Sequence, residues 1–191
     1  MNLPNKLTLF RVIIVPFFVF FMCFSAISYR FLYATILFGL ASLTDMLDGK
    51  IARKYNLITD FGKFLDPLAD KVLVAAALVC FIELKWTSAW VVFIILTREF
   101  LVSGIRLVAA SSPKKAVIPA NIWGKLKTAV TMVAMAVILI MAVLCEDFGI
   151  IGDDFPIQII RDVLMYLTAL LTVISGVIYV YDYREFIDPK K

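Results

Sequence analysis

Long apolar segments divide this chain and leave few folds open to it. Each segment has about the 20 residues that a helix needs to cross a bilayer. None shows the strict alternation that is typical of membrane β-strands. We therefore predict an all-α, polytopic membrane protein, a single domain over residues 1–191 that forms a bundle of six transmembrane helices. The predicted spans are residues 7–27, 31–53, 64–84, 88–109, 121–145 and 157–183.

Composition supports a membrane protein and excludes some chemistry. Hydrophobic residues make up 62% of the chain, against about 45–50% in soluble domains. The chain has no histidine, which excludes His-based catalysis and His metal sites. Cys23, Cys80 and Cys145 lie in apolar runs without a CxxC pair, so we expect reduced packing residues. The first segment is too long for a cleaved signal, and Pro16 should bend it.

The charges between the segments predict the orientation. The cation-rich side carries Lys6, Arg11, Lys50, Arg53, Lys54, Lys63, Arg106, Lys114, Lys115, Arg184, Lys190 and Lys191. The other side carries Arg30, Lys85 and Arg161, with the acidic residues Glu146, Asp147, Asp153 and Asp154. The positive-inside rule then places both termini in the cytoplasm, with the protein in the cytoplasmic membrane. The net charge of +4 fits cytoplasmic loops and anionic lipid, so we expect no nucleic-acid partner.

Four aspartates lie where the second and third segments meet. Asp45 and Asp48 are spaced i, i+3 at the end of one segment, and Asp66 and Asp70 are spaced i, i+4 at the start of the next. Each pair therefore occupies one helical face, and a short connection makes the two helices neighbours. Four carboxylates at such short separations would repel one another unless a cation neutralised them. Their oxygen ligands favour Mg²⁺, Mn²⁺ or Ca²⁺ over zinc.

Basic residues lie within the fourth and fifth segments, at the same predicted membrane depth as the four aspartates. They are Arg98 and Arg106 in TREFLVSGIR, with Glu99 beside Arg98, and Lys125 and Lys127 in GKLKTA. Charges inside spans usually face the bundle interior or a wet cavity. A metal site beside a basic pocket suits phosphoryl transfer, in which one carboxylate removes a proton from an attacking hydroxyl.

The residues from Asp45 to Asp70 resemble the signature of the CDP-alcohol phosphotransferase family. The matching pattern is Asp45-x2-Asp48-Gly49-x2-Ala52-Arg53-x8-Gly62-x3-Asp66-x3-Asp70. The resemblance implies that Asp45, Asp48 and Asp66 hold a pair of Mg²⁺ or Mn²⁺ ions, while Asp70 completes the metal site and acts as the general base. It also implies a homodimer and a pocket for the cytidine nucleotide of a CDP-lipid. That pocket would be lined by Gly49, Ala52, Arg53 and Gly62, with Asn5, Thr8 and Lys63 nearby.

Two weaker features resemble the phosphatidylglycerophosphate synthases within that family. They are the N-terminal Asn2-Leu3-Pro4-Asn5-x-Leu7-Thr8-x2-Arg11 and the pairing of TREFLVSGIR with GKLKTA. The resemblance implies transfer of phosphatidyl from CDP-diacylglycerol to glycerol 3-phosphate at the cytoplasmic face. A phosphorylated acceptor needs cations, which Arg98, Arg106, Lys125 and Lys127 supply.

Three other functions remain open from the sequence. An inositol phosphate acceptor would use a similar cation patch. A divalent-cation transporter would also carry carboxylates, although nothing acidic continues from this cluster through the spans. A non-catalytic lipid-binding scaffold predicts that Asp70→Asn leaves activity in cells intact.

Overall fold

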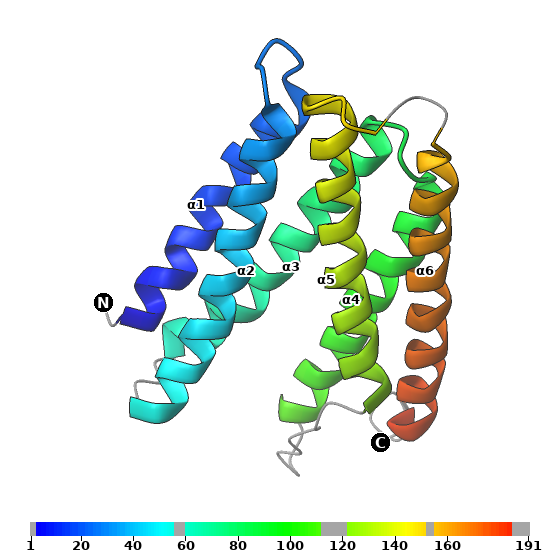
Figure 1. Ribbon diagram of the computed structural model, residues 1–191. Coiled ribbons are helices and arrows are strands. Elements are labelled where there is room, and N and C mark those ends of the chain that lie inside the picture. Colours follow the sequence, from blue (N-terminus) through cyan, green and yellow to red (C-terminus); the bar gives the residue numbers. More distant parts are fainter. Residues whose placement is uncertain (1–2, 56–59, 112–121, 152–154, 185–191) are drawn as a thin grey trace. The chain divides into compact units, whose positions relative to one another are not determined.

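The described part of the chain is built from helices. The computed structural model describes residues 3–55, 60–111, 122–151 and 155–184, with side chains for the same residues except 3–4, 46–55, 60–68, 70 and 110–111. These residues form six α-helices and one π-helix, with no strand among them (Figure 1). The all-α prediction is confirmed. The elements are α1 (Leu3–Cys23), α2 (Arg30–Tyr55), α3 (Asp60–Glu83), α4 (Ala89–Ser111), α5 (Ile122–Ala142), η1 (Val143–Asp147) and α6 (Ile157–Asp182).

Three of the described helical stretches are long and apolar enough to cross a membrane. They are Asn5–Cys23, Ile122–Asp147 and Ile157–Asp182. A helix rises 1.5 Å per residue, so stretches of 19 to 26 residues extend about 29–39 Å, which matches a hydrocarbon core of about 30 Å. Of the other three helices, α4 carries Arg98, Glu99 and Arg106 within its apolar sequence, and α2 and α3 have described side chains over only part of their length. Six spans and two cytoplasmic termini therefore stay predictions.

The chain divides into two compact units. The first unit contains Met1–Trp86 and Met135–Ile157, and the second contains Thr87–Ala134 and Gln158–Lys191. The helix α5 therefore contributes its first part to the second unit and its last part to the first. The division into two units does not test our prediction of one domain over residues 1–191, which stays a prediction.

In the first unit, α1 packs against both α2 and α3. Phe18 of α1 is fully buried, with its ring centroid 6.1 Å from that of Phe38 in α2. Ala34 and Ala41 are also fully buried and are spaced i, i+7, so small residues lie on one face of α2. Buried aromatic side chains of this kind contribute strongly to the packing of helices.

An acidic residue distant in sequence caps the start of α2. The backbone N–H of Leu32 donates to Asp147 Oδ2 at 2.7 Å. The first N–H groups of a helix have no partner within the helix, and a carboxylate there is also favoured by the helix dipole. This bond fastens η1, which continues α5, to the beginning of α2.

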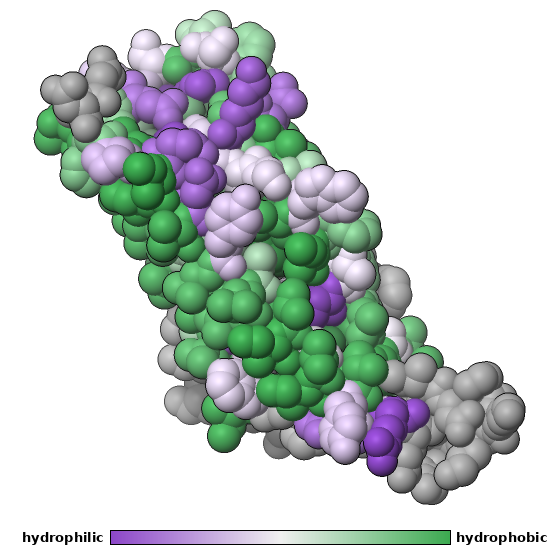
Figure 2. Space-filling view, turned by 90° about the vertical axis from the view of Figure 1, so that its right-hand side faces the viewer, coloured by the Kyte–Doolittle hydropathy of each residue, from purple (hydrophilic) through white to green (hydrophobic). Residues whose placement is uncertain are grey.

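The second unit is formed by α4, the first part of α5 and α6. Val102 and Ile105 of α4 are buried with Tyr179 of α6. Apolar side chains such as Ile159, Val163, Leu170 and Val177 instead leave an exposed stripe along α6, as expected where lipid covers a helix. Figure 2 shows a surface of this kind, with hydrophobic residues over its middle and hydrophilic residues toward its ends.

The cysteine prediction holds in part. All three cysteines are free, and Cys80 is buried as a packing residue. Cys23 is exposed instead, with its Sγ 3.9 Å from Cys80 Sγ. Pro16 lies inside α1, which continues through it, and the predicted bend stays a prediction.

Candidate active site

The helices α2 and α3 give the four aspartates the backbone that the spacing requires. The helix α2 runs through Asp45 and Asp48 to Tyr55, so these two residues share one face. The helix α3 begins at Asp60, before the predicted residue 64, and contains Asp66 and Asp70 one turn apart. Both pairs therefore lie on regular helix.

The earlier start of α3 also changes the setting of Gly62 and Lys63. The predicted span starts at residue 64, after both residues, but both lie in the first turn of α3. Asp66 lies beyond that turn, so the helix dipole, which acts within the first turn, gives it little stabilisation. The helix dipole therefore does not explain a carboxylate here, and the metal-ligand role of Asp66 stays a prediction.

Asp45 has a described side chain, and it pairs with an arginine of α1. Arg11 Nη1 lies 2.6 Å from Asp45 Oδ1. The Arg11 side chain is 1% exposed, whereas that of Asp45 is 46% exposed. An ion pair this close favours one position of the carboxylate and still leaves it open on one side. Asp45 can therefore be oriented by Arg11 and bind a further cation.

Sequence reasoning missed this role of Arg11. The sequence indicates only a cytoplasmic charge that belongs to the N-terminal pattern. The available signal was its spacing from two other polar residues: Asn5, Thr8 and Arg11 recur every three residues within α1. All three are buried, and Arg11 places this face of α1 toward α2. Asn5 and Thr8, two predicted nucleotide-pocket residues, therefore lie on the face that carries the partner of Asp45.

The metal cluster itself lies largely outside the described side chains. The structure does not describe the side chains of Asp48, Asp66 and Asp70. The same is true of the pocket candidates Gly49, Ala52, Arg53, Gly62 and Lys63. Among the described side chains, no three His, Cys, Asp or Glu residues come together. The donor chemistry fits a hard divalent ion, since the four predicted ligands are all carboxylates on two consecutive helices. The assignment stays a proposal.

The predicted acceptor residues lie in the second unit, where α6 contacts two of them. Arg98 Nη2 donates to Ser175 Oγ at 2.6 Å, and Arg98 Nη1 lies 3.4 Å from Glu99 Oε1. Arg98 Nε is buried and has no hydrogen-bond partner among the described residues. Arg106 Nε donates to the hydroxyl of Tyr179 at 2.9 Å. The two arginines are thus held along one side of α6.

The two lysines differ in their surroundings. Lys127 is buried, and its ammonium group forms an ion pair with Glu99. Lys125 is exposed. Arg98 and Glu99 are adjacent in the sequence and form an ion pair. Glu99 lies closer to Lys127 than to Arg98. Arg98, Glu99 and Lys127 therefore form one charged group between α4 and α5.

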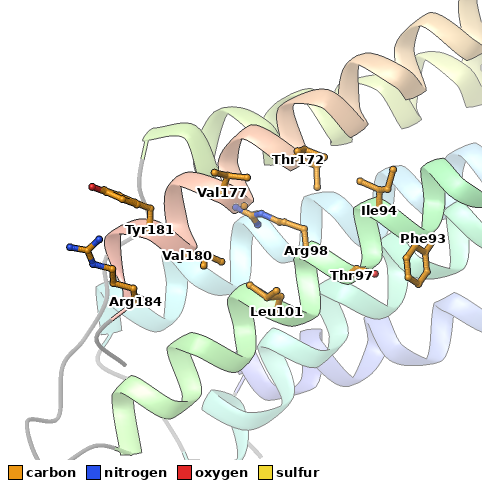
Figure 3. Close-up of a pocket in the computed structure, with 12 residues that line it drawn as sticks. Phe93, Ile94, Thr97, Arg98, Leu101, Thr172, Val177, Val180, Tyr181 and Arg184 are labelled. Carbon is orange, nitrogen blue, oxygen red and sulfur yellow. The ribbon is translucent and has the colours of Figure 1, made fainter. Parts of the chain in front are cut away.

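An apolar groove of about 610 Å³ runs beside Arg98 between α4 and α6. Its apolar walls include Leu101 of α4 and Val177 of α6, and Arg184 lies at one end. Figure 3 shows Arg98 reaching from α4 toward α6, with Tyr181 and Arg184 at the far end of α6. A groove of this lining suits a hydrocarbon chain better than a polar ligand.

Comparison with known proteins identifies the family. A family model described as CDP-alcohol phosphatidyltransferase matches residues 1–174. The chain belongs to the CDP-alcohol phosphatidyltransferase family. The match confirms the family predicted from Asp45 to Asp70 and extends far beyond that signature.

Several relatives of this CDP-alcohol phosphatidyltransferase carry the name CDP-diacylglycerol–glycerol-3-phosphate 3-phosphatidyltransferase. The Bacillus subtilis protein is 40% identical over 92% of this chain and 91% of its own length. The Rickettsia typhi protein is 38% identical over 93% of this chain and 94% of its own. The Haemophilus influenzae protein is 37% identical over 93% of this chain and 91% of its own.

Proposed function

We propose that this CDP-alcohol phosphatidyltransferase transfers the phosphatidyl group of CDP-diacylglycerol to glycerol 3-phosphate, with phosphatidylglycerophosphate and CMP as products. The observation that carries the proposal is the name shared by relatives that are 37–40% identical over more than nine-tenths of the chain. The basic residues of α4 and α5 support it independently, because a phosphorylated acceptor needs cations.

Asp45, Asp48, Asp66 and Asp70 would hold two Mg²⁺ or Mn²⁺ ions. When bound, the ions would neutralise the diphosphate of CDP-diacylglycerol and stabilise the departing CMP. The helical register of α2 and α3 supports this ligand set, as does the paired and partly exposed carboxylate of Asp45.

The nucleotide would bind beside these aspartates. Gly49, Ala52 and Gly62 lack bulky side chains, so a nucleotide can approach the two helix backbones closely. Asn5 and Thr8 offer polar atoms from the buried face of α1. The residues that we assign to the CDP-lipid are Asn5, Thr8, Gly49, Ala52, Arg53, Gly62 and Lys63.

The transfer needs one proton acceptor, which we assign to Asp70. The 1-hydroxyl oxygen of glycerol 3-phosphate attacks the phosphorus attached to diacylglycerol, and its proton passes to the Asp70 carboxylate. The bond from that phosphorus to the CMP oxygen breaks, and CMP leaves with the bonding electron pair. The hydroxyl oxygen becomes the new ester oxygen of phosphatidylglycerophosphate.

Arg98, Arg106, Lys125 and Lys127 would bind the phosphate of the acceptor. Arg98 offers a buried Nε–H without a partner among the described residues, and such a donor is costly to leave unsatisfied. A phosphate oxygen would satisfy it. Lys127 is paired with Glu99, so the phosphate would share this lysine with the carboxylate.

The membrane placement follows from the charges and the apolar helices. We propose six spans, both termini in the cytoplasm, and an active site at the cytoplasmic face of the cytoplasmic membrane. There a lipid substrate can enter from the bilayer and a water-soluble acceptor from the cytoplasm. A homodimer is part of the proposal.

The acceptor is tested by product identification. Purified protein is incubated with CDP-diacylglycerol, Mg²⁺ and an equal mixture of glycerol 3-phosphate and inositol 1-phosphate, and the lipid products are separated by mass. We expect phosphatidylglycerophosphate as the main product. Phosphatidylinositol phosphate as the main product would assign the other acceptor, and release of CMP without a new lipid would argue against transfer altogether.

A further inference from the structure

Three residues on one side of α6 contact the two arginines of α4. Ser175 Oγ accepts a hydrogen bond from Arg98 at 2.6 Å, and the Tyr179 hydroxyl accepts one from Arg106 at 2.9 Å. The guanidinium carbon of Arg106 also lies 5.5 Å from the centroid of the Tyr179 ring. Ser175 and Tyr179 are spaced i, i+4, so one helical face serves both cations.

Gly176 is the third residue, and it provides the space through which Arg98 passes. A Cβ built on Gly176 would lie 3.0 Å from Arg98 Cγ. This contact involves the stem of the side chain rather than its flexible end, so a methyl group there would require the stem of Arg98 to shift by a few tenths of an ångström. A glycine in the middle of a helix costs stability relative to alanine, so its presence here calls for a packing reason.

We propose that Ser175, Gly176 and Tyr179 are positioning residues that hold Arg98 and Arg106 ready for the acceptor phosphate. The inference rests on the proposed function, in which these arginines bind that phosphate. A free arginine side chain loses considerable rotamer entropy when it binds an anion. Contacts from α6 restrict the two side chains beforehand, so binding the acceptor costs less free energy.

The positioning is specific to the acceptor, because the predicted metal ligands Asp45, Asp48, Asp66 and Asp70 are on other helices. Loss of a contact from α6 should therefore weaken binding of glycerol 3-phosphate and leave CDP-diacylglycerol largely unaffected. Such a loss raises KM for one substrate and changes kcat little.

Tyr179→Phe and Tyr183→Phe form the first matched pair. Each substitution removes one hydroxyl and keeps the ring, and the two rings pack with centroids 4.7 Å apart. The hydroxyl of Tyr179 is the one that bonds Arg106. We expect Tyr179→Phe to raise the KM for glycerol 3-phosphate roughly tenfold, as for loss of a hydrogen bond to a charged group, and Tyr183→Phe to leave it within about twofold.

Gly176→Ala and Gly104→Ala form the second pair. No atom lies within 4 Å of a Cβ built on Gly104, so alanine there should be neutral or slightly stabilising. We expect Gly176→Ala to raise the KM for glycerol 3-phosphate at least as much as Ser175→Ala does. The variants are compared by their melting temperatures in detergent, so that a folding defect is recognised.

The measurement is the KM for each substrate and kcat in the wild type and all five variants, with Mg²⁺ present. A rise in the acceptor KM confined to Tyr179→Phe, Ser175→Ala and Gly176→Ala supports the inference. Equal rises for both substrates, or equal effects of Tyr179→Phe and Tyr183→Phe in folded protein, would overturn it while the proposed function stands. A folded wild-type protein that makes no phosphatidylglycerophosphate would refute the proposed function, and this inference with it.

Discussion

At the scale of single residues, the pair between Arg11 and Asp45 links the N-terminal helix to the predicted metal site. Arg11 is buried and Asp45 is half exposed. Removing Asp45 therefore leaves a buried charge, whereas removing Arg11 leaves a charge that water can reach. The first loss should therefore cost more.

The stabilities of Asp45→Asn and Arg11→Met test this asymmetry. We expect Asp45→Asn to lower stability by about 1–3 kcal/mol, and Arg11→Met to lower it less. Thermal unfolding is followed in detergent with EDTA, so that metal binding does not contribute. If both variants lose the same stability, or Arg11→Met loses more, burial of Arg11 does not make the loss of Asp45 the costlier one.

Asp70→Asn tests the assignment of the general base. The amide keeps the size of the side chain but cannot accept the proton from the attacking hydroxyl. We expect kcat to fall about 10²–10⁴-fold, with binding of CDP-diacylglycerol within a few-fold of the wild type. Single-turnover rates check the fall in turnover, and a binding isotherm checks the affinity for CDP-diacylglycerol. Turnover near the wild-type rate in Asp70→Asn would assign the base elsewhere.

At the scale of helices, the sequence predicted the elements better than their ends. Hydropathy placed the first helix at residues 7–27, whereas α1 runs from Leu3 to Cys23. Asn5 and Thr8 are polar but buried against neighbours, so tertiary contacts allow the helix to begin before the apolar run. In the same way α3 begins at Asp60, because aspartate is favourable in the first turn of a helix.

The candidate site was predictable to different degrees. The aspartates have a rigid spacing on helices whose existence follows from hydropathy, so their helical faces could be derived from the sequence alone. The contacts of Ser175 and Tyr179 could not, because the sequence does not say which helix packs beside α4. Arg11 was visible as a charge in an apolar segment, but its partner depends on how α1 packs against α2.

The cap on α2 gives a prediction at this scale. Asp147→Ala removes the acceptor for the Leu32 N–H, so we expect a loss of about 0.5–2 kcal/mol and a lower melting temperature. Glu146→Gln is the control on the neighbouring exposed position and should have little effect. If the two variants melt at the same temperature as the wild type, the cap contributes nothing measurable.

At the scale of the whole molecule, orientation decides which substrates reach the site. The cation-rich loops predict that both termini face the cytoplasm. An alkaline phosphatase fusion, which is active only outside the cytoplasm, should therefore be inactive after Lys191 and active in the turn at Lys85. Activity in the reverse pattern would place the aspartates on the outer side, away from a cytoplasmic acceptor.

The central claim is that aspartates on α2 and α3 gather divalent cations that drive transfer from CDP-diacylglycerol to glycerol 3-phosphate. The most direct measurement is formation of phosphatidylglycerophosphate by purified protein in excess EDTA, before and after Mg²⁺ is restored. We predict no product in EDTA and recovery with Mg²⁺ in the wild type, but no recovery in Asp66→Asn. Undiminished product in EDTA would contradict the account.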